Sequence, residues 1–424
     1  MITLQNRSAV LSRRQFAVGT VAALLAGKSS GAGFNKYEGP FLITINAGGG
    51  WDLSLYADPK ENTADEPPIT HWSADYVTQS TGNIRYAPVG NNQAFFEAHA
   101  DRMLLINGVD TQTNAHETGQ LHTWTGSSSA GRPSLTALFA AAKGPDLPLP
   151  YTNFSGFGIN KGLVRAAKAN PNTVRELLAP RAEPEQELLG RFRSRGFSRL
   201  KDRAVNTTVE INRIREAQLA QESVPSLTQL YDALSDQLAG ADAVFNGSNE
   251  LTKALLTSLL IFGEGLGVAT ECRADGGWDT HEDGESAQIQ LLTQLNDSLM
   301  SLWEMAEKLG VAEKLIVVVS SDFGRTPYYN SYGGKDHWPI NSYIIMQGGV
   351  QWANRVVGKT DNLQNAMPIN PKTLQIDSSK SLIYPKHVHH ALHHYLGISD
   401  FAHSVGFGFG AETLFDFFNP AIAT

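Results

Sequence analysis

Acidic and histidine side chains follow apolar or glycine-rich runs at separate places in this chain. Asp322 ends a Val-rich run, and His337 follows fifteen positions later, next to Asp336. Upstream, Asp279 and His281 stand two apart on a glycine-rich stretch. Ligands and metals lie at the carboxyl ends of strands in open α/β sheets. Since carboxylate and imidazole together suit Zn²⁺, Mn²⁺ or Fe²⁺ better than Ca²⁺ or Mg²⁺, the pattern predicts a metal site of that kind.

A third carboxylate follows the same pattern near the start of the chain. The apolar run of residues 41–45 leads into three glycines, a tryptophan and then Asp52. This order of strand, glycines and carboxylate predicts that Asp52 belongs to the same metal site. The alternative is that Asp52 caps a helix, which is a common use of an aspartate at this kind of position.

The elements that must position these residues alternate between strand and helix patterns, which favours an α/β core. Residues 351–371 are predicted to form a surface hairpin or loop. Residues at about 170–240 are rich in charged, long side chains and predict a helical insertion, either a cap beside the strand ends or an arm for self-association. The predicted strands are 41–46, 103–107, 315–320 and 342–346, and the predicted helices are 92–100, 134–142, 285–310 and 386–396.

The start of the chain predicts export. Arg13 and Arg14 precede an apolar run over residues 17–26 and then small residues, which is typical of a twin-arginine signal peptide at residues 1–32. We expect a periplasmic or secreted protein that meets the twin-arginine export machinery and has no stable membrane anchor. The alternative is a basic amphipathic start of a cytosolic protein. A net charge of −8 without a long basic block argues against nucleic acid as a partner.

Several ordered motifs resemble those of the DUF1501 family of exported bacterial proteins. They are the paired arginines, GGGWD at 48–52, DPK at 58–60, HxxxxLHxWxG at 116–126, GGWDTH at 276–281, SSDFGRTP at 320–327 and GKDHWP at 334–339. The family is similar in turn to the alkaline phosphatase-like superfamily, which includes sulfatases and phosphoglycerate mutases. The resemblance implies one domain over residues 33–424, with a doubly wound, mostly parallel sheet and one or two metals at its strand ends.

The superfamily pattern implies roles for these residues one by one. Asp279, His281 and His337 resemble one intact metal site. Asp52 and Asp322 resemble a second site, in which Phe323 stands where the superfamily has a histidine. Asp336 either replaces that lost ligand or orients the neighbouring imidazole.

The position of the superfamily's nucleophile is changed. His116 stands where a serine attacks phosphorus in phosphoglycerate mutases, so it is a metal ligand or a nitrogen nucleophile here. Thr118, Thr125 and Ser127 are nearby hydroxyls that can take the nucleophile's role instead. Arg325 either clamps an anionic substrate or makes a structural salt bridge.

Histidines elsewhere have ordinary explanations. His122 is a weaker site candidate than His116. The five histidines between His387 and His394 include pairs four residues apart on a predicted helix face, but they are expected to belong to an ordinary helix.

Two functions therefore remain open from the sequence. The first is an exported, metal-dependent hydrolase of phosphate or sulfate esters, in which a Zn²⁺- or Mn²⁺-like ion activates a hydroxyl or water. The second is a non-catalytic, metal-containing binding or assembly protein that keeps the fold with a degenerate site.

Overall fold

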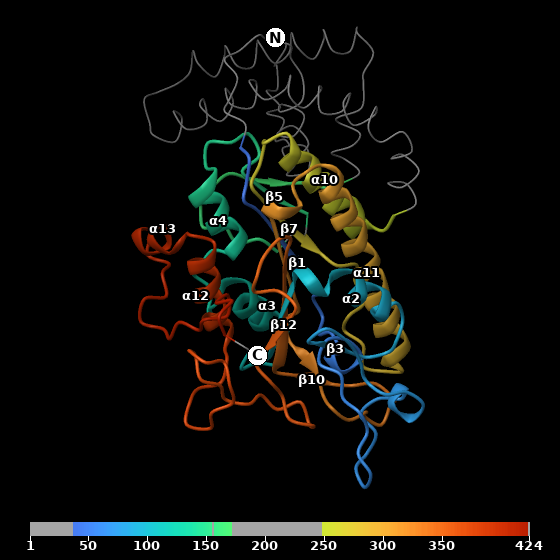
Figure 1. The fold of residues 1–424 in the computed structure, drawn as a ribbon. Helices are drawn as coiled ribbons and strands as arrows, with labels where there is room; N and C mark the ends of the chain where they lie inside the picture. The colour runs from blue at the N-terminus through green and yellow to red at the C-terminus, as the bar shows by residue number, and fades with distance from the viewer. Residues whose placement is uncertain (1–36, 155–156, 172–247, 423–424) are drawn as a thin grey trace, which may run out of the picture. The chain divides into compact units, whose positions relative to one another are not determined.

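The computed structural model describes residues 37–154, 157–171 and 248–422 (Figure 1). The chain divides into two compact units, one of residues 37–166 and 244–424 and the other of residues 1–36 and 167–243. The described residues belong almost entirely to the first unit. The predicted signal peptide and the predicted helical insertion lie outside the described residues.

The core is an eight-stranded sheet in the order β12-β4-β11-β8-β1-β7-β5-β6. All pairings around its centre are parallel except those of β11, which runs antiparallel to β4 and β8. The fold is therefore mixed α/β with a large, mostly parallel sheet, as the sequence predicted. The strands of this sheet are β1 (Phe41–Asn46), β4 (Met103–Asp110), β5 (Tyr151–Asn153), β6 (Ala166–Lys168), β7 (Ala269–Arg273), β8 (Leu315–Ser320), β11 (Ile340–Gln347) and β12 (Arg355–Val357).

The central strands β1 and β8 are apolar because both of their faces are covered. Every residue of each strand is buried, and the two strands pair in parallel register from Phe41 opposite Leu315 to Asn46 opposite Ser320. A continuous Val- and Ile-rich run, without polar alternation, is what burial on both faces requires. The carboxyl ends of these two strands therefore meet at one edge of the sheet.

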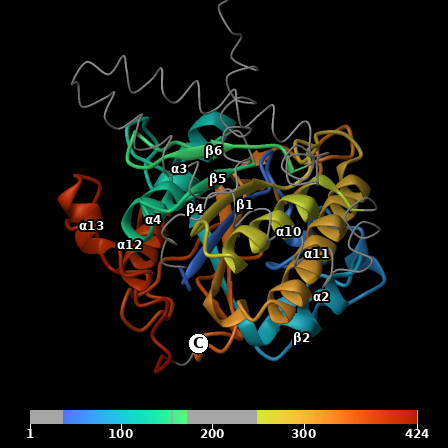
Figure 2. The ribbon, with the colours of Figure 1, turned by 90° about the horizontal axis from the view of Figure 1, so that it is seen from above.

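Helices cover the two faces of the sheet (Figures 1 and 2). One face carries α3 (His116–Thr125), α4 (Leu135–Lys143), α12 (Pro385–Tyr395) and α13 (Ser399–Ser404). The other carries α2 (Asn92–His99), α10 (Glu250–Gly263) and α11 (Gly284–Lys308). The remaining elements are the hairpin β2 (Gln79–Thr81) and β3 (Ile84–Tyr86), the pair β9 (Gly324–Arg325) and β10 (His337–Trp338), and the short helices η1 (Leu53–Leu55), η2 (Trp72–Ala74), η3 (Ala100–Arg102) and η4 (Ala312–Lys314).

The predicted strands and helices fall close to observed ones, but several observed elements were not predicted, among them the helices α3 and α10. Residues 355–357 were expected in a surface hairpin or loop but form β12, which pairs in parallel with β4 at the sheet edge. The strand β7 was not predicted, because its polar Glu271 and Arg273 interrupt the apolar pattern. All of its residues except Arg273 are buried, beside β1.

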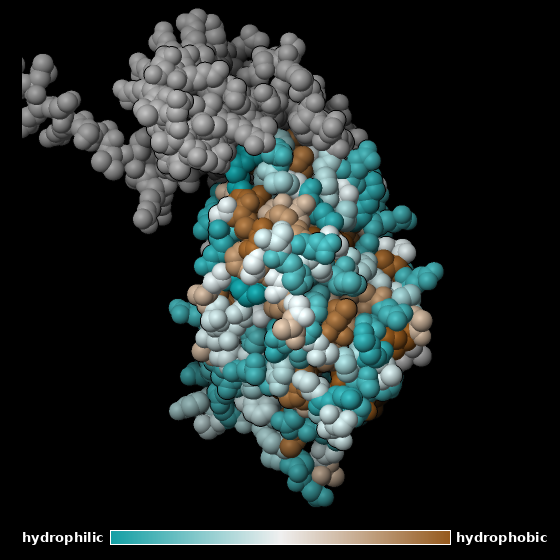
Figure 3. All heavy atoms as spheres, turned by 90° about the vertical axis from the view of Figure 1, so that its left-hand side faces the viewer, coloured by the Kyte–Doolittle hydropathy of each residue, from teal (hydrophilic) through white to brown (hydrophobic). Residues whose placement is uncertain are grey.

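The surface of the described part is mixed in polarity. The face that carries α4, α12 and α13 shows small hydrophobic areas separated by hydrophilic residues (Figure 3). Within the described ranges, no helix combines the length and the apolar character that a membrane crossing needs.

Candidate metal centre

Four loops converge at the carboxyl ends of the parallel strands. They follow β1, β4, β7 and β8, and the last of them returns through β10 to the start of β11. Sharp turns let the loops approach one another closely. Gly49 has φ +135°, and a Cβ there would lie 2.7 Å from the backbone nitrogen of Asp279. Where α3 meets the loop after β8, a Cβ at Gly119 would lie 2.6 Å from the carbonyl oxygen of Asp322. Glycine at these two positions is therefore what brings the site loops into contact.

Asp322 is a buried anchor. Its Oδ1 accepts hydrogen bonds from the amides of Gly49 and Gly50, at 2.8 and 2.9 Å, and from the Ser321 hydroxyl at 2.8 Å. Its Oδ2 lies 2.6 Å from Nδ1 of His116. Burial raises the pKa of Asp322, but these hydrogen bonds, with that from His116 the strongest, outweigh burial and hold the pKa below its usual range. Asp322 is thus a carboxylate whose oxygens are already engaged by protein donors.

Three imidazoles point their Nε2 atoms toward Asp279. Nε2 of His337 lies 3.0 Å and Nε2 of His281 lies 2.9 Å from Asp279 Oδ1. Nε2 of His116 lies 3.3 Å from Asp279 Oδ2. The ligand atoms of His116, Asp279 and His337 all lie within 4.8 Å of one another, the spacing of a group that can hold a metal ion.

The opposite nitrogen of each ring is fixed by an oxygen acceptor. Nδ1 of His337 lies 2.8 Å from the carbonyl oxygen of Asn114, and Nδ1 of His281 lies 3.2 Å from Asp336 Oδ1. Nδ1 of His116 meets Asp322, as described above. Because a carbonyl or carboxylate oxygen only accepts, each Nδ1 must carry the proton and donate it. In its neutral form each ring then has its unprotonated Nε2 available to a metal ion, which is the second-sphere arrangement of metal-bound histidines.

His116 has an atom without a hydrogen-bond partner. Its Nε2 is buried and, among the residues that the structure describes, no hydrogen bond satisfies it. Its ring is tilted against Phe323 and meets His337 edge to face. The hydrogen bond that Nδ1 of His116 donates to Asp322 raises the pKa of His116. A buried nitrogen that has no hydrogen-bond partner and faces a carboxylate fits the role of a metal ligand.

Arg325 holds Asp279 in place. The guanidinium is 1% exposed, and it donates to the carbonyl groups of Gly49, Gly50, Trp278 and Lys335 and, at 2.9 Å, to Asp279 Oδ1. Burial raises the pKa of Asp279, but hydrogen bonds from His337 and Arg325 lower it well below the usual range. The geometry favours the structural alternative for Arg325 over a substrate clamp, since its donors are engaged within the protein.

Asp52 is held by partners outside this group of ligands. Its Oδ2 lies 2.8 Å from Nζ of Lys335, and its Oδ1 accepts from the backbone nitrogen and the hydroxyl of Ser54, where it caps η1. Both charged side chains are buried, at 3% and 4% exposed. The sequence placed Asp52 among the metal ligands or at a helix cap; in the structure one of its oxygens meets a lysine ammonium and the other caps η1, so its role as a metal ligand stays a prediction.

The remaining predicted residues fall into different places. Asp336 contacts Nδ1 of His281, which favours the alternative in which it orients an imidazole. Thr118 is half-buried on α3, and its described contacts do not link it to the four side chains, so its role as nucleophile stays a prediction. His122 is buried, and its Nδ1 bonds the carbonyl of Thr111. The carbonyl of Asn114 was not predicted, because every residue offers a backbone oxygen and no side-chain signal marks this one.

The histidines of α12 form part of the core. His389 donates from Nε2 to the carbonyl of Thr123, and His393 packs against Phe409. Burial lowers the pKa of His387 and of His389 to about 4. Within the described ranges, they are not part of a group with metal-ligand spacing.

The donor set around Asp279 fits a transition-metal or zinc ion. Three imidazole nitrogens and one carboxylate suit Zn²⁺, Mn²⁺ or Fe²⁺, whereas Ca²⁺ and Mg²⁺ prefer oxygen shells. Two nitrogens at about 2.0–2.1 Å from a tetrahedral Zn²⁺ lie about 3.3 Å apart. The 3.0 Å between Nε2 of His281 and Nε2 of His337 is close to that separation. The side chain of Asp279 is 49% exposed and that of His281 is 42% exposed, so the group opens to solvent on one side.

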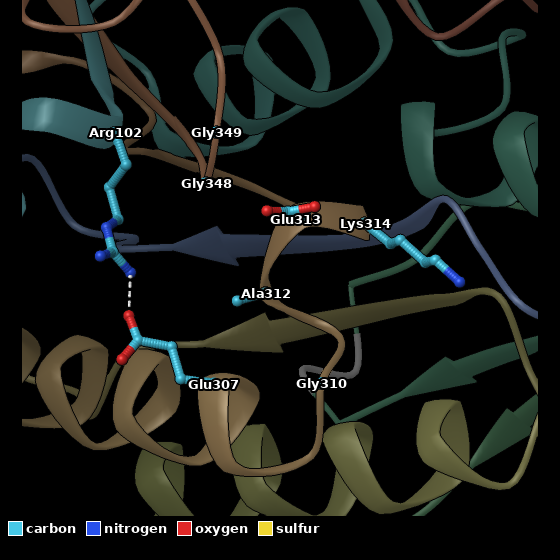
Figure 4. Close-up of a pocket in the computed structure, with 8 residues that line it drawn as sticks. All are labelled: Arg102, Glu307, Gly310, Ala312, Glu313, Lys314, Gly348 and Gly349. Atoms are coloured by element: carbon cyan, nitrogen blue, oxygen red, sulfur yellow. Dashed lines mark hydrogen bonds and ion pairs between the residues drawn. The ribbon is translucent and has the colours of Figure 1, made fainter.

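The described cavity lies elsewhere. It has a volume of about 400 Å³ and is lined by Arg102, Glu307, Lys314 and their neighbours (Figure 4). Arg102 precedes β4 and Lys314 precedes β8, so this cavity lies at the amino ends of the parallel strands. Arg102 and Glu307 close an ion pair of 2.8 Å across it. The cavity is therefore separate from the candidate metal centre, and one of its two cationic side chains, Arg102, is already paired.

A family model described as a protein of unknown function, DUF1501, matches residues 43–392. The chain belongs to the DUF1501 family. Among curated proteins, none matches the chain in sequence. The family assignment agrees with the motifs from which the resemblance was drawn, and those motifs include every side chain of the centre.

Solved structures of similar fold are distant from this DUF1501 protein. The alkaline phosphatase from the Antarctic bacterium TAB5 has a TM-score of 0.34 and 10% identity, covering 76% of this chain and 95% of that chain. A Bacteroides thetaiotaomicron protein of glycosaminoglycan metabolism has a TM-score of 0.40 and 9% identity, covering 91% and 78%. The lipoteichoic acid synthase from Listeria monocytogenes has a TM-score of 0.35 and 8% identity, covering 90% and 78%. Similarities this low carry no argument about function, which is argued from the site itself.

Proposed function

We propose that this DUF1501 protein is a metal-dependent hydrolase of phosphate or sulfate esters that uses one divalent ion held by His116, Asp279, His281 and His337. The observation that supports the proposal is the convergence of three Nε2 atoms on one carboxylate, with each Nδ1 fixed by an oxygen acceptor. The ligand atoms of three of these side chains, His116, Asp279 and His337, lie within 4.8 Å of one another.

A bound divalent ion at this position supplies Lewis-acid polarisation of an ester oxygen and a lowered pKa for water. The protein's own residues do the positioning. Asp322 fixes the tautomer and orientation of His116, Arg325 holds the carboxylate of Asp279, and the loop carbonyl of Asn114 fixes His337. The exposed side of the group leaves room for a substrate to approach from solvent, which catalytic metal sites require.

The test is metal analysis combined with turnover. We expect about one Zn²⁺ or Mn²⁺ per chain in protein purified from the exported fraction, and hydrolysis of at least one aryl phosphate or sulfate ester by that protein. The metal-free protein should lose turnover and regain it when the ion is restored. If the protein binds metal but hydrolyses no phosphate or sulfate ester, the hydrolase proposal is wrong.

A second candidate is a non-catalytic, metal-containing binding or assembly protein. The observation that favours it is the donor count, since three imidazoles and a carboxylate fill a four-coordinate shell, as closed structural sites do. X-ray absorption of the zinc-loaded protein separates the two. A shell of four protein donors without a water ligand supports the binding protein, whereas a shell with an additional or exchangeable oxygen supports the hydrolase.

The proposed location is the periplasm, reached by the twin-arginine route. Its support is the sequence around Arg13 and Arg14, followed by an apolar run and small residues. Replacing both arginines by lysine should keep the full-length precursor in the cytoplasm. Export of that variant at the normal rate would contradict the route.

A further inference from the structure

The loops that build the metal centre are strongly acidic. Residues 46–56, 110–120, 276–286 and 321–340 contain nine acidic side chains and two basic ones, Arg325 and Lys335. A site that binds a doubly charged anion normally presents arginine or lysine to it, because these groups compensate the anion's charge. What the two basic residues do therefore decides which anions this centre can receive.

Neither basic side chain is free to meet a substrate. Arg325 is 1% exposed, and all three of its guanidinium nitrogens donate to protein acceptors. Lys335 is 4% exposed, and its Nζ lies 2.8 Å from Asp52 Oδ2 and 2.8 Å from the Ser54 hydroxyl. Both side chains therefore use their charge and their donors within the protein, where they hold the loops together.

The exposed charges beside the centre are negative. The side chain of Asp336 is 60% exposed and contacts His281, whereas Asp279, which is 49% exposed, is itself a proposed ligand and pairs with Arg325. An additional negative charge placed about 4–7 Å from one such carboxylate weakens binding about three- to sixfold, even at the dielectric constant of water. A bound divalent ion attracts any anion, and the carboxylate of Asp336 offsets part of that attraction for each further unit of negative charge.

We propose that the centre receives esters with a single negative charge and discriminates against the dianions of phosphate monoesters. Sulfate monoesters and phosphodiesters carry one charge, whereas a phosphate monoester carries nearly two above about pH 6. This inference rests on the proposed function and narrows its substrate class.

The test compares two ligands that differ by one charge, phenyl sulfate and phenyl phosphate, at about pH 8. The full chain is loaded with Mn²⁺, whose unpaired electrons broaden the NMR lines of ligand protons close to it, so binding is measured without turnover. We expect phenyl sulfate to bind at least about threefold more tightly than phenyl phosphate. Equal or tighter binding of phenyl phosphate would overturn the proposal.

A variant that removes one charge tests whether the preference for phenyl sulfate arises at the metal centre. Asp336→Asn keeps an oxygen that accepts from His281 Nδ1 but removes one negative charge, so the preference for phenyl sulfate should shrink by about threefold when both proteins are saturated with Mn²⁺. Glu304→Gln is the matched control, because it removes the same charge near the far end of α11, about 30 Å along the helix from Gly284. The control should keep the preference for phenyl sulfate over phenyl phosphate. If both variants lose that preference, the net charge of the whole protein sets it, and the position of Asp336 does not.

The failures are distinguishable. If phenyl phosphate binds as well as phenyl sulfate while esters are hydrolysed, the charge selectivity is wrong and the hydrolase proposal stands. If neither ligand is broadened by Mn²⁺ and no ester is hydrolysed, both proposals fail together.

Discussion

Nε2 of His281 lies 3.0 Å from Nε2 of His337, and the opposite nitrogen of each ring is fixed on an oxygen acceptor. With both Nδ1 atoms protonated, the two Nε2 lone pairs face each other. Two lone pairs at this distance repel, unless a proton or a metal ion lies between them and Asp279. The relationship is therefore typical of ligands arranged for a cation, and it leads directly to a first prediction.

Replacing either imidazole by alanine should reduce metal affinity strongly. Loss of a residue that only supports a ligand typically costs about 10–100-fold in affinity, so His281→Ala and His337→Ala should cost more than that. Competition with a chromogenic chelator measures the change. His394→Ala is the matched control, because this exposed histidine of α12 lies outside the centre. Equal affinity in all three variants would remove His281 and His337 from the ligand set.

Asp322 should act on the metal through His116. Asp322→Asn keeps the size of the side chain but removes the charge that accepts the Nδ1 proton at 2.6 Å. We expect a loss of about 10–100-fold in metal affinity, while the metal stoichiometry at saturation stays the same. If Asp322 instead binds the metal directly, the loss should match that of His337→Ala, so the two variants are measured side by side.

Arg325 should contribute more to stability than to ligand binding. Arg325→Lys keeps the charge but leaves several buried carbonyls without a donor, and hydrogen bonds to charged groups contribute about 1.5–3 kcal/mol each. We expect the free energy of unfolding to fall by about 2–4 kcal/mol in a urea titration. Arg102→Lys is the control, since Arg102 makes surface ion pairs, and it should cost at most about 1 kcal/mol. A larger loss in the control than in Arg325→Lys would contradict the structural role.

The sequence predicted the loop ligands because their chemistry is local. Asp279 and His281 stand two apart after glycines, and His337 follows a strand-end aspartate, so type and spacing alone mark them. The partners that fix them are not local. The carbonyl of Asn114 is chemically the same as any other, and the pairing of Lys335 with Asp52 joins loops far apart in the chain, so only the folded structure separates a ligand from an ion pair.

The same limit applies to the fold. Continuous apolar runs predicted β1 and β8 within a residue of their ends, because burial on both faces leaves an unbroken signal. Short strands lack that signal. β12 has three residues and takes its place only by pairing with β4, and polar side chains in β7 conceal a strand that is central to the sheet.

Substitutions of Lys335 and Asp52, which form a buried ion pair, should have strongly non-additive effects on the free energy of unfolding. Lys335→Met leaves the carboxylate of Asp52, 3% exposed, without its cation, and breaking a buried pair in this way costs about 3–5 kcal/mol of unfolding free energy. The double variant Asp52→Asn with Lys335→Met removes both charges and should recover most of that loss. Lys308→Met, in an exposed pair on α11, is the control and should cost at most about 1 kcal/mol.

That cycle also tests the number of ions. If Lys335 replaces a second cation beside Asp52, Lys335→Met can open a second, weak metal position, whereas the wild type binds one ion. Two ions per chain in the wild type would contradict the assignment of Asp52 to the ion pair.

Stability should fall in mild acid because of buried neutral histidines. Burial lowers the pKa of His99, His387 and His389 to about 4, whereas an unfolded histidine has a pKa of about 6.5. The unfolded state therefore binds more protons between these values. The free energy of unfolding drops as the pH falls from about 6.5 to about 4 and does not drop further from this cause below that range.

His389 provides the sharpest test of this acid sensitivity. It is 1% exposed, and its Nε2 donates to the carbonyl of Thr123 at 2.7 Å. His389→Gln keeps a donor but cannot take up a proton. Between about pH 7 and pH 5, its free energy of unfolding should therefore fall by about 2 kcal/mol less than that of the wild type. Urea titrations of the metal-free protein at both values measure this, because metal binding has its own pH dependence. His394→Gln, at an exposed position on the same helix, should leave the loss as in the wild type. Identical losses in the two variants would mean that His389 does not resist protonation in the folded state.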